Sequence, residues 1–185
     1  GKRPEEIRCK VVANAMDLKL IERQIELKKL VGDSFNKINI SFEWFDLRDK
    51  NESEVKHNVE NLDLLWFCGG NVYYLRHLLK SSGLDKLLTD SLKNTCVLGG
   101  ESAGALIMGP TLKYLDLVDD PSLVQEVIYD GLAIIDFVPL PHWKNEKYQE
   151  RLAAIKANLE NDDCKVVVFS DNQAIIVNGD KVELL

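Results

Sequence analysis

The sequence predicts an α/β fold, built on a mostly parallel sheet with a small antiparallel hairpin near its end. Three observations support this fold class. Short apolar runs alternate along the chain with segments of helical periodicity. Two of those runs stop at paired glycines, Gly69-Gly70 and Gly99-Gly100, as strands do before a turn. Asn178-Gly179 separates two final apolar runs and is a strong hairpin signal.

The first half of the chain supplies the candidate strands of the sheet and the helices between them. The strand segments are rich in β-branched, aromatic or other apolar residues: Ile7–Ala15, Ile38–Leu47, Asp63–Cys68 and Thr95–Leu98. Spaced apolar positions, capping residues and glycine stops indicate the helices: Leu18–Val31, with Asp17 as its N-cap and Gly32 at its end, then Asn51–Leu62, Asn71–Lys80, Leu84–Lys93 and Ser102–Met108.

The second half of the chain is less regular. Between Thr111 and Asp130 the pattern leaves alternatives open. Tyr114–Val118 fits a strand, Asp119-Asp120-Pro121 fits a turn, and Ser122–Tyr129 fits a helical turn or a strand. The remaining predicted elements are a strand over Leu132–Val138, an amphipathic helix over Asn145–Leu159, a strand over Val166–Phe169, and a hairpin of Ala174–Val177 with Lys181–Leu185.

Length and charge limit the classes of function. A chain of 185 residues fits a single domain, residues 1–185, with a sizeable core. The net charge of −7 is spread along the chain, which argues against nucleic acid or an anionic membrane surface as partner. The sequence contains neither a membrane-length apolar run nor a secretory signal.

The cysteines indicate free thiols rather than a metal site. All four, Cys9, Cys68, Cys96 and Cys164, lie in or beside apolar runs, without a C-x-x-C pair or a zinc-like spacing. Buried free thiols are typical of a reducing compartment, so we expect a cytoplasmic protein.

One stretch carries the clearest chemical signal. Gly100-Glu101-Ser102-Ala103-Gly104 has the G-x-S-x-G spacing of a nucleophile elbow, in which a serine occupies a sharp strand-to-helix turn. The flanking glycines allow the chain to approach itself closely, and the helix that follows directs its first N–H groups at an oxyanion. Such short patterns also occur by chance, in turns that simply favour Gly and Ser. The rest of the sequence is therefore needed to distinguish a nucleophile from an ordinary turn.

The ends of the predicted strands supply that context. In parallel sheets, sites form beyond the carboxyl ends of the strands, and Gly69-Gly70, Ser102 and Pro141-His142 all follow strands. A serine needs a base to take its proton, and His142 is the only histidine downstream of Ser102. We therefore expect His142 to be the general base, against the simpler interpretation of a hydrogen-bonded loop histidine.

The base needs an acid partner, and this assignment stays open. Asp171 fits best because it also follows an apolar strand, although an aspartate before an asparagine is common in ordinary turns. Asp136 and Glu101 are the alternatives. For the oxyanion hole, the N–H groups of Ala103 and Gly70 are the candidates, Ala103 because it follows the serine and Gly70 because it lacks a side chain.

The order of these residues excludes the fold in which this elbow is most common. An α/β-hydrolase runs Ser, acid, His, whereas this chain runs Ser102, His142, Asp171. Four stretches, in their order and spacing, instead resemble the peptidase E (aspartyl dipeptidase) family of serine peptidases: Gly69-Gly70-Asn71, Gly100–Ala105, Leu140-Pro141-His142 and Ser170–Ile175.

The resemblance implies a flavodoxin-like sheet between helices, as in class I glutamine amidotransferases. It implies Ser102 as nucleophile, His142 as base, Asp171 as acid, Gly70 and Ala103 as oxyanion hole, and no metal or cofactor. Two departures stand out. The family's opening strand should precede Ile7, so we expect it to be missing here. The aspartyl dipeptidase branch also carries glutamate at the Asp171 position and an arginine in a longer loop after the histidine.

The leading hypothesis is a cytoplasmic serine peptidase that hydrolyses small peptides through an acyl-enzyme, with N-terminal Asp-X peptides as one option. The alternatives are a cyanophycinase-like or other amide hydrolase and a non-catalytic binding module on the same scaffold. A thiol amidotransferase is disfavoured because serine occupies the elbow. The sequence leaves a homodimer open.

Overall fold

The computed structural model describes residues 1–90 and 96–185. Its main sheet contains four parallel strands in the order β2-β1-β3-β4. These strands are β1 (Cys9–Val12), β2 (Phe42–Trp44), β3 (Leu64–Phe67) and β4 (Val97–Gly100). Two smaller sheets follow: β5 (Val138–Leu140) pairs in parallel with β6 (Val166–Val168), and β7 (Ile175–Asn178) pairs antiparallel with β8 (Lys181–Leu184). The predicted fold class is confirmed.

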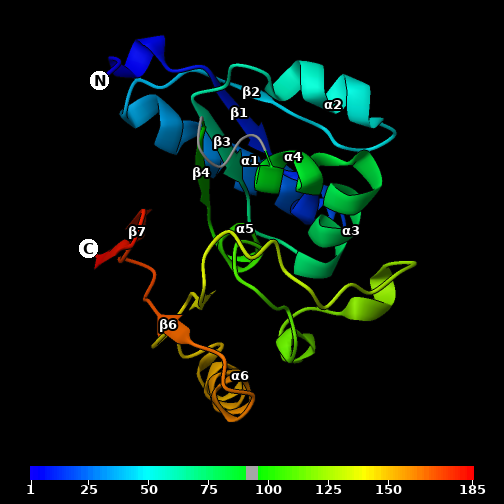
Figure 1. The fold of residues 1–185 in the computed structure, drawn as a ribbon, viewed down its shortest axis with the longest axis vertical. Coiled ribbons are helices and arrows are strands. Elements are labelled where there is room, and N and C mark those ends of the chain that lie inside the picture. The colour runs from blue at the N-terminus through cyan, green and yellow to red at the C-terminus, as the bar shows by residue number, and fades with distance from the viewer. Residues whose placement is uncertain (91–95) are drawn as a thin grey trace.

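The helices are α1 (Ile21–Lys37), α2 (Glu52–Val59), α3 (Val72–Ser82), α4 (Leu84–Asp90), α5 (Ala103–Leu106) and α6 (Gln149–Asn161). In Figure 1 the main sheet and α1–α4 form one part of the molecule, and β6, β7 and α6 lie beyond α5. The last residues of the predicted helix Leu84–Lys93, and Thr95 of the predicted strand, lie outside the described residues.

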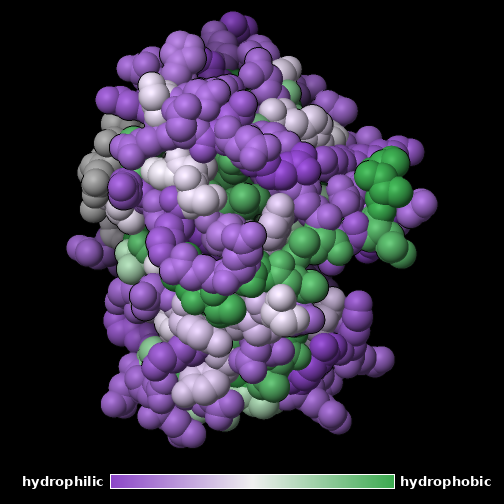
Figure 2. Space-filling model, turned by 90° about the vertical axis from the view of Figure 1, so that its right-hand side faces the viewer, coloured by the Kyte–Doolittle hydropathy of each residue, from purple (hydrophilic) through white to green (hydrophobic). Residues whose placement is uncertain are grey.

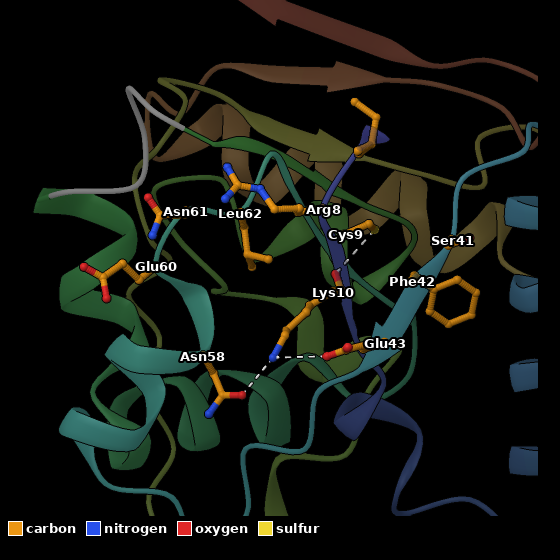
Figure 3. Close-up of a pocket in the computed structure, with 11 residues that line it drawn as sticks. Arg8, Cys9, Lys10, Ser41, Phe42, Glu43, Asn58, Glu60, Asn61 and Leu62 are labelled. Carbon is orange, nitrogen blue, oxygen red and sulfur yellow. Dashed lines mark hydrogen bonds and ion pairs between the residues drawn. The ribbon is translucent and has the colours of Figure 1, made fainter. Parts of the chain in front are cut away.

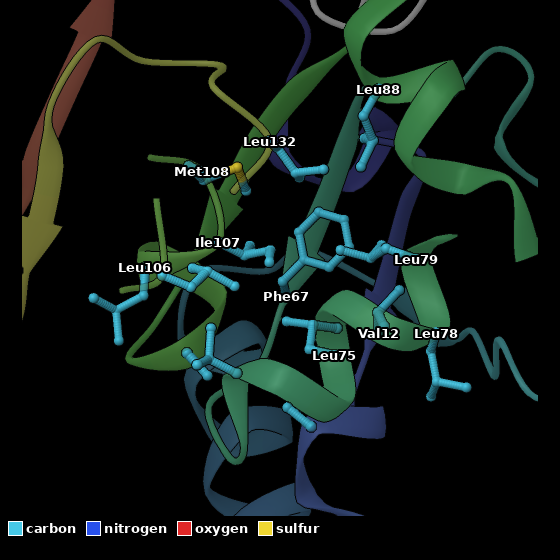
Figure 4. Close-up of a cluster of buried hydrophobic side chains, with 14 of the residues drawn as sticks. Val12, Phe67, Leu75, Leu78, Leu79, Leu88, Leu106, Ile107, Met108 and Leu132 are labelled. Carbon is cyan, nitrogen blue, oxygen red and sulfur yellow. The ribbon is translucent and has the colours of Figure 1, made fainter. Parts of the chain in front are cut away.

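Alternating side chains of the strands divide the core into two layers. Val12 and Phe67 face the larger cluster, which contains the buried residues of α2, α3 and α4. Figure 4 shows Phe67 in the middle of this cluster, close to Leu79. Val11 faces the smaller cluster, which includes Phe35 of α1. Helices therefore cover both faces of the sheet, as a parallel sheet requires. Figure 2 shows a largely hydrophilic surface crossed by a band of hydrophobic residues.

The predicted limits of the first helix are wrong. Asp17 and Gly32 do not cap it: α1 begins at Ile21 and continues through Gly32 to Lys37. Asp17 instead follows the short 3₁₀ turn Asn14–Met16 and accepts a hydrogen bond from the Asn14 side chain. Phe35, beyond the glycine, is only 6% exposed, so its burial favours continuation of the helix.

The segment before β5 also differs from the prediction. Leu132–Val138 is a strand only at its end, because β5 is Val138–Leu140. The N–H groups of Leu132 and Ile134 donate to carbonyls at Ile107 and Met108, just after α5, and not to a strand. Similarly, Tyr114–Val118 contains the 3₁₀ turn Leu115–Leu117 and no strand. The hairpin is where the sequence places it, with Gly179 at φ 57°.

Candidate active site

Ser102 occupies a strained backbone position between β4 and α5. Its φ is 51° and its ψ −116°, a combination that residues with a side chain rarely adopt. The positions on either side of it require glycine, because neighbouring backbone atoms leave no room for a Cβ. A Cβ on Gly100 would lie 2.3 Å from the Gly104 carbonyl oxygen, and one on Gly104 would lie 2.0 Å from the Phe67 carbonyl oxygen. The tight turn therefore presses α5 against β3 and exposes the serine at the end of the sheet.

The side chains of Ser102, His142 and Asp171 form one hydrogen-bonded chain. His142 Nε2 lies 2.9 Å from Ser102 Oγ, and His142 Nδ1 lies 2.5 Å from Asp171 Oδ1. With the proton on Nδ1, the imidazole donates to the carboxylate, and Nε2 accepts from the serine hydroxyl. The three residues follow β4, β5 and β6, so strands of two different sheets supply the cluster.

The two alternative acids have other partners. Asp136 is exposed and pairs with Lys165 Nζ at 2.5 Å. Glu101 reaches the surface, but the protein atoms packed around its carboxyl raise its pKa, and the Gly69 backbone partly offsets this effect. It is Asp171 that accepts the hydrogen bond from His142 Nδ1.

Asp171 is held from two sides. Asn145 Nδ2 donates to Asp171 Oδ2 at 2.9 Å, and these hydrogen bonds from Asn145 and then His142 lower the pKa of the Asp171 carboxyl. The Tyr148 ring stacks on the His142 ring, with centroids 5.3 Å apart and planes at 28°. Sequence reasoning missed both Asn145 and Tyr148. The sequence feature that could have indicated Asn145 was an amide side chain three residues after the histidine, but this segment was interpreted only as part of a helix.

Of the two candidate oxyanion residues, Ala103 directly follows the serine, and Gly70 follows a glycine that contacts it. Ala103 is the first residue of α5. Gly69 contacts the serine so closely that a Cβ there would lie 2.9 Å from Ser102 Cβ. Gly70 follows at φ 150°, where a Cβ would lie 1.9 Å from the Ala15 carbonyl oxygen. Only glycine fits at this position, which brings the backbone after β3 next to the elbow.

Two cavities differ in their relation to this cluster. One, of about 380 Å³, lies at the amino ends of β1 and β2, the edge of the sheet opposite to Ser102; Arg8, Lys10 and Phe42 are among its lining residues (Figure 3). The other, of about 610 Å³, lies at the start of α6 and includes Tyr148, the residue that stacks on His142.

Within residues 1–90 and 96–185, no group of three His, Cys, Asp or Glu side chains is placed to hold a metal ion. In that same part of the chain, none of the helices combines the length and the apolar character needed to cross a bilayer.

Comparison with known proteins identifies the family. The model of peptidase family S51 matches residues 21–185. The chain belongs to peptidase family S51. This result confirms the family predicted from the sequence, and the match covers every residue of the Ser102, His142 and Asp171 cluster.

Similar proteins are peptidases by name. An uncharacterised peptidase of Listeria innocua is 29% identical over 138 residues, which span 74% of this chain and 66% of that protein. An uncharacterised peptidase of Listeria monocytogenes is 28% identical over 146 residues, 78% of this chain and 71% of that protein. The chain thus spans about two thirds of the length of these relatives. A putative peptidase E structure from Listeria monocytogenes superposes with a TM-score of 0.86 at 24% identity, covering 100% of this chain and 88% of that one.

Proposed function

We propose that this S51 chain is a serine-type peptidase that cleaves small peptides through an acyl-enzyme. The observation that carries the proposal is the hydrogen-bonded chain from Ser102 Oγ through the His142 ring to Asp171. A hydroxyl 2.9 Å from an imidazole nitrogen can lose its proton as it attacks a carbonyl, and an imidazole oriented by a carboxylate can accept it. A non-catalytic binding module would have no need of this alignment.

The proposed reaction uses each residue in turn. Ser102 Oγ attacks the peptide carbonyl carbon while His142 Nε2 takes the hydroxyl proton. The N–H groups of Gly70 and Ala103 stabilise the oxyanion of the tetrahedral intermediate. His142 then donates its proton to the leaving amine as the C–N bond breaks, and a water molecule, activated by the same nitrogen, hydrolyses the ester. Asp171 stabilises the imidazolium in both half-reactions.

The charged residues after His142 and the names of related proteins support a substrate class. Two related proteins from Shewanella are named peptidase E, and each is 28% identical over 87 residues. The basic side chains of Lys144, Lys147 and Arg151 are exposed just after His142. Exposed Glu146 and Glu150 lie between these residues, so the segment has three cations, two anions and a net charge of only +1. Its basic groups therefore favour an acidic peptide by direct pairing with a carboxylate rather than by long-range attraction. We therefore infer short acidic peptides, with N-terminal Asp-X dipeptides as the first class to assay. A homodimer and a cytoplasmic location remain predictions.

The experiment compares wild type with Ser102→Ala on a panel of Asp-X dipeptides and neutral dipeptides, with a β-linked Asp-Arg dipeptide as the cyanophycinase-type alternative. We expect Ser102→Ala to lower kcat by at least about 10³-fold. Ser34→Ala is the matched control, because Ser34 is exposed on α1 and its hydroxyl donates to the Leu30 carbonyl of the same helix. Hydrolysis by Ser102→Ala at the wild-type rate would contradict the proposal, and preference for the β-linked substrate would reassign the substrate class.

A further inference from the structure

Asn145 contacts both the proposed base and the proposed acid. It lies three residues after His142, in the turn between β5 and α6. Its Nδ2 donates to Asp171 Oδ2 at 2.9 Å, and its backbone N–H donates to the His142 carbonyl at 3.0 Å. A single residue therefore links the two ends of the His142–Asp171 hydrogen bond.

The exposure of Asp171 gives this link its importance. The Asp171 side chain is 54% exposed, whereas the acid of a catalytic triad is usually buried and thereby fixed. Water competes for both oxygens of an exposed carboxylate. An exposed carboxylate also lacks the surrounding packing that keeps a buried one from rotating. With Oδ1 on the His142 ring and Oδ2 on Asn145, both oxygens are held and the plane of the carboxylate is fixed.

The orientation of the Asn145 amide is itself determined. Asn145 Oδ1 accepts the Lys147 backbone N–H at 3.1 Å, which leaves Nδ2 to face the carboxylate. A flipped amide would place two acceptors against each other at Asp171 and two donors at Lys147. The backbone around it is unusual as well, since His142 and Lys144 have φ values of 63° and 72°. Backbone conformations of this kind persist where surrounding contacts hold them. The hydrogen bond from the Asn145 N–H to the His142 carbonyl closes the turn that contains His142 and Lys144.

We propose that Asn145 is a positioning residue of the active site: its hydrogen bond fixes the orientation of the exposed Asp171 carboxylate toward His142, a role that burial performs in other triads. The inference rests on the proposed peptidase function, since its effect on rate passes through Asp171. The Asn145 side chain hydrogen-bonds to Asp171 and to the Lys147 backbone, so it acts on the reaction through Asp171.

The test is a double-mutant cycle on kcat and KM with Asn145→Ala, Asp171→Ala and the double variant. In the wild-type background we expect Asn145→Ala to lower kcat about 10- to 100-fold with little change in KM. In the Asp171→Ala background the same change should cost less than about threefold, because the group through which Asn145 acts is gone. An equal loss of kcat in both backgrounds, or no loss in either, would overturn the proposal.

Two further variants separate positioning from general damage to the turn. Asn145→Asp keeps the acceptor for the Lys147 N–H but replaces the donor facing Asp171 with a like charge, so it should lower kcat at least as much as Asn145→Ala while retaining the wild-type melting temperature to within a few degrees. Asn58→Ala is the matched control: that asparagine accepts from Lys10 and donates to the Glu54 carbonyl, both at 2.8 Å, and should leave kcat unchanged. Loss of activity in Asn58→Ala to the same extent would contradict a specific role.

A spectroscopic measurement makes the inference separable from the proposed function. A short imidazole–carboxylate hydrogen bond gives a strongly downfield Nδ1 proton in the NMR spectrum, and this readout needs no substrate. We expect the signal in wild type, its loss in Asp171→Ala, and its loss or broadening in Asn145→Ala. An unchanged signal in Asn145→Ala would overturn the positioning role even in an active peptidase. A signal lost in Asn145→Ala, in a protein that hydrolyses no peptide, would sustain the positioning and reject the function.

Discussion

Gly104→Ala should destabilise the protein, although helix propensity alone predicts the opposite. Gly104 lies within α5, and in a helix alanine is favoured over glycine by about 0.5–1 kcal/mol. In this structure a Cβ at Gly104 would lie 2.0 Å from the Phe67 carbonyl oxygen and 2.9 Å from the Phe67 Cβ. The nearest atom belongs to the backbone of β3, so it cannot move aside as the end of a flexible side chain could.

The magnitude follows from the balance of these two effects. Overpacking in a dense core costs about 1–3 kcal/mol, and contact with backbone places this site at the upper end. Subtracting the helical preference leaves a loss of about 2 kcal/mol, or about 4–8 °C in melting temperature for a chain of this size. The shift that relieves the contact separates α5 from β3, so Ser102 moves away from His142 and the hydrolytic rate falls as well.

Gly32→Ala is the matched control, because Gly32 is also helical but has room for a Cβ without a clash. The nearest atom to a Cβ there is Phe42 Cζ, at 3.9 Å. Alanine should therefore stabilise the protein by about 0.5–1 kcal/mol. Urea and thermal denaturation of both variants measure whether each substitution raises or lowers the free energy of unfolding. A Gly104→Ala variant as stable as Gly32→Ala would refute the close packing of the elbow on β3.

Three other predictions concern strain, charge and thiols. Ser102→Gly should be about 1 kcal/mol more stable than Ser102→Ala, because glycine relieves the strain at φ 51° while both variants lack the hydroxyl; equal melting temperatures would argue against a strained elbow. The native state lowers the pKa of Asp171 below the usual carboxyl value of 3.8, so ionisation of this group stabilises the native state at pH values above 3.8. This stabilisation is lost as the pH falls through the lowered pKa of the native state. Asp171→Asn should therefore be less stable than wild type at pH 7, and the difference should shrink as the pH falls below 3.8, as urea titrations at a series of pH values would show. A thiol reagent at pH 8 should modify half-buried Cys164 ahead of the three buried cysteines, because burial raises the pKa of all three thiols, to about 11 for Cys9 and Cys96. All four should react in urea, and rapid reaction of four thiols in the native protein would contradict the described core.

Much of the sheet could be predicted because its sequence signals are local. Asp63–Cys68 contains β3, and the glycines after it mark where the strand ends. The Asn71 side chain caps α3 by accepting the Tyr74 N–H, so this helix begins as the sequence indicates. The rarity of histidine downstream of Ser102 narrowed the choice of base to His142, which the structure places 2.9 Å from the serine. The catalytic role of this residue remains a prediction.

Other features depend on contacts between distant segments. The end of α1 is set by the burial of Phe35 against the sheet, and a glycine at position 32 carries no information about that packing. The loop from Leu132 onward has the composition of a strand, but its N–H groups bond to the end of α5. Asn145 is one asparagine among many until the fold places it against Asp171, 26 positions further along the chain.

The most direct test of the proposed site is the reaction of Ser102 with a fluorophosphonate, followed by intact mass and peptide mapping. We expect one adduct per chain, located on Ser102, that forms much more slowly in His142→Ala and does not form in Ser102→Ala. A protein that stays unmodified under conditions that label a known serine peptidase, or an adduct on another residue, would contradict the central claim.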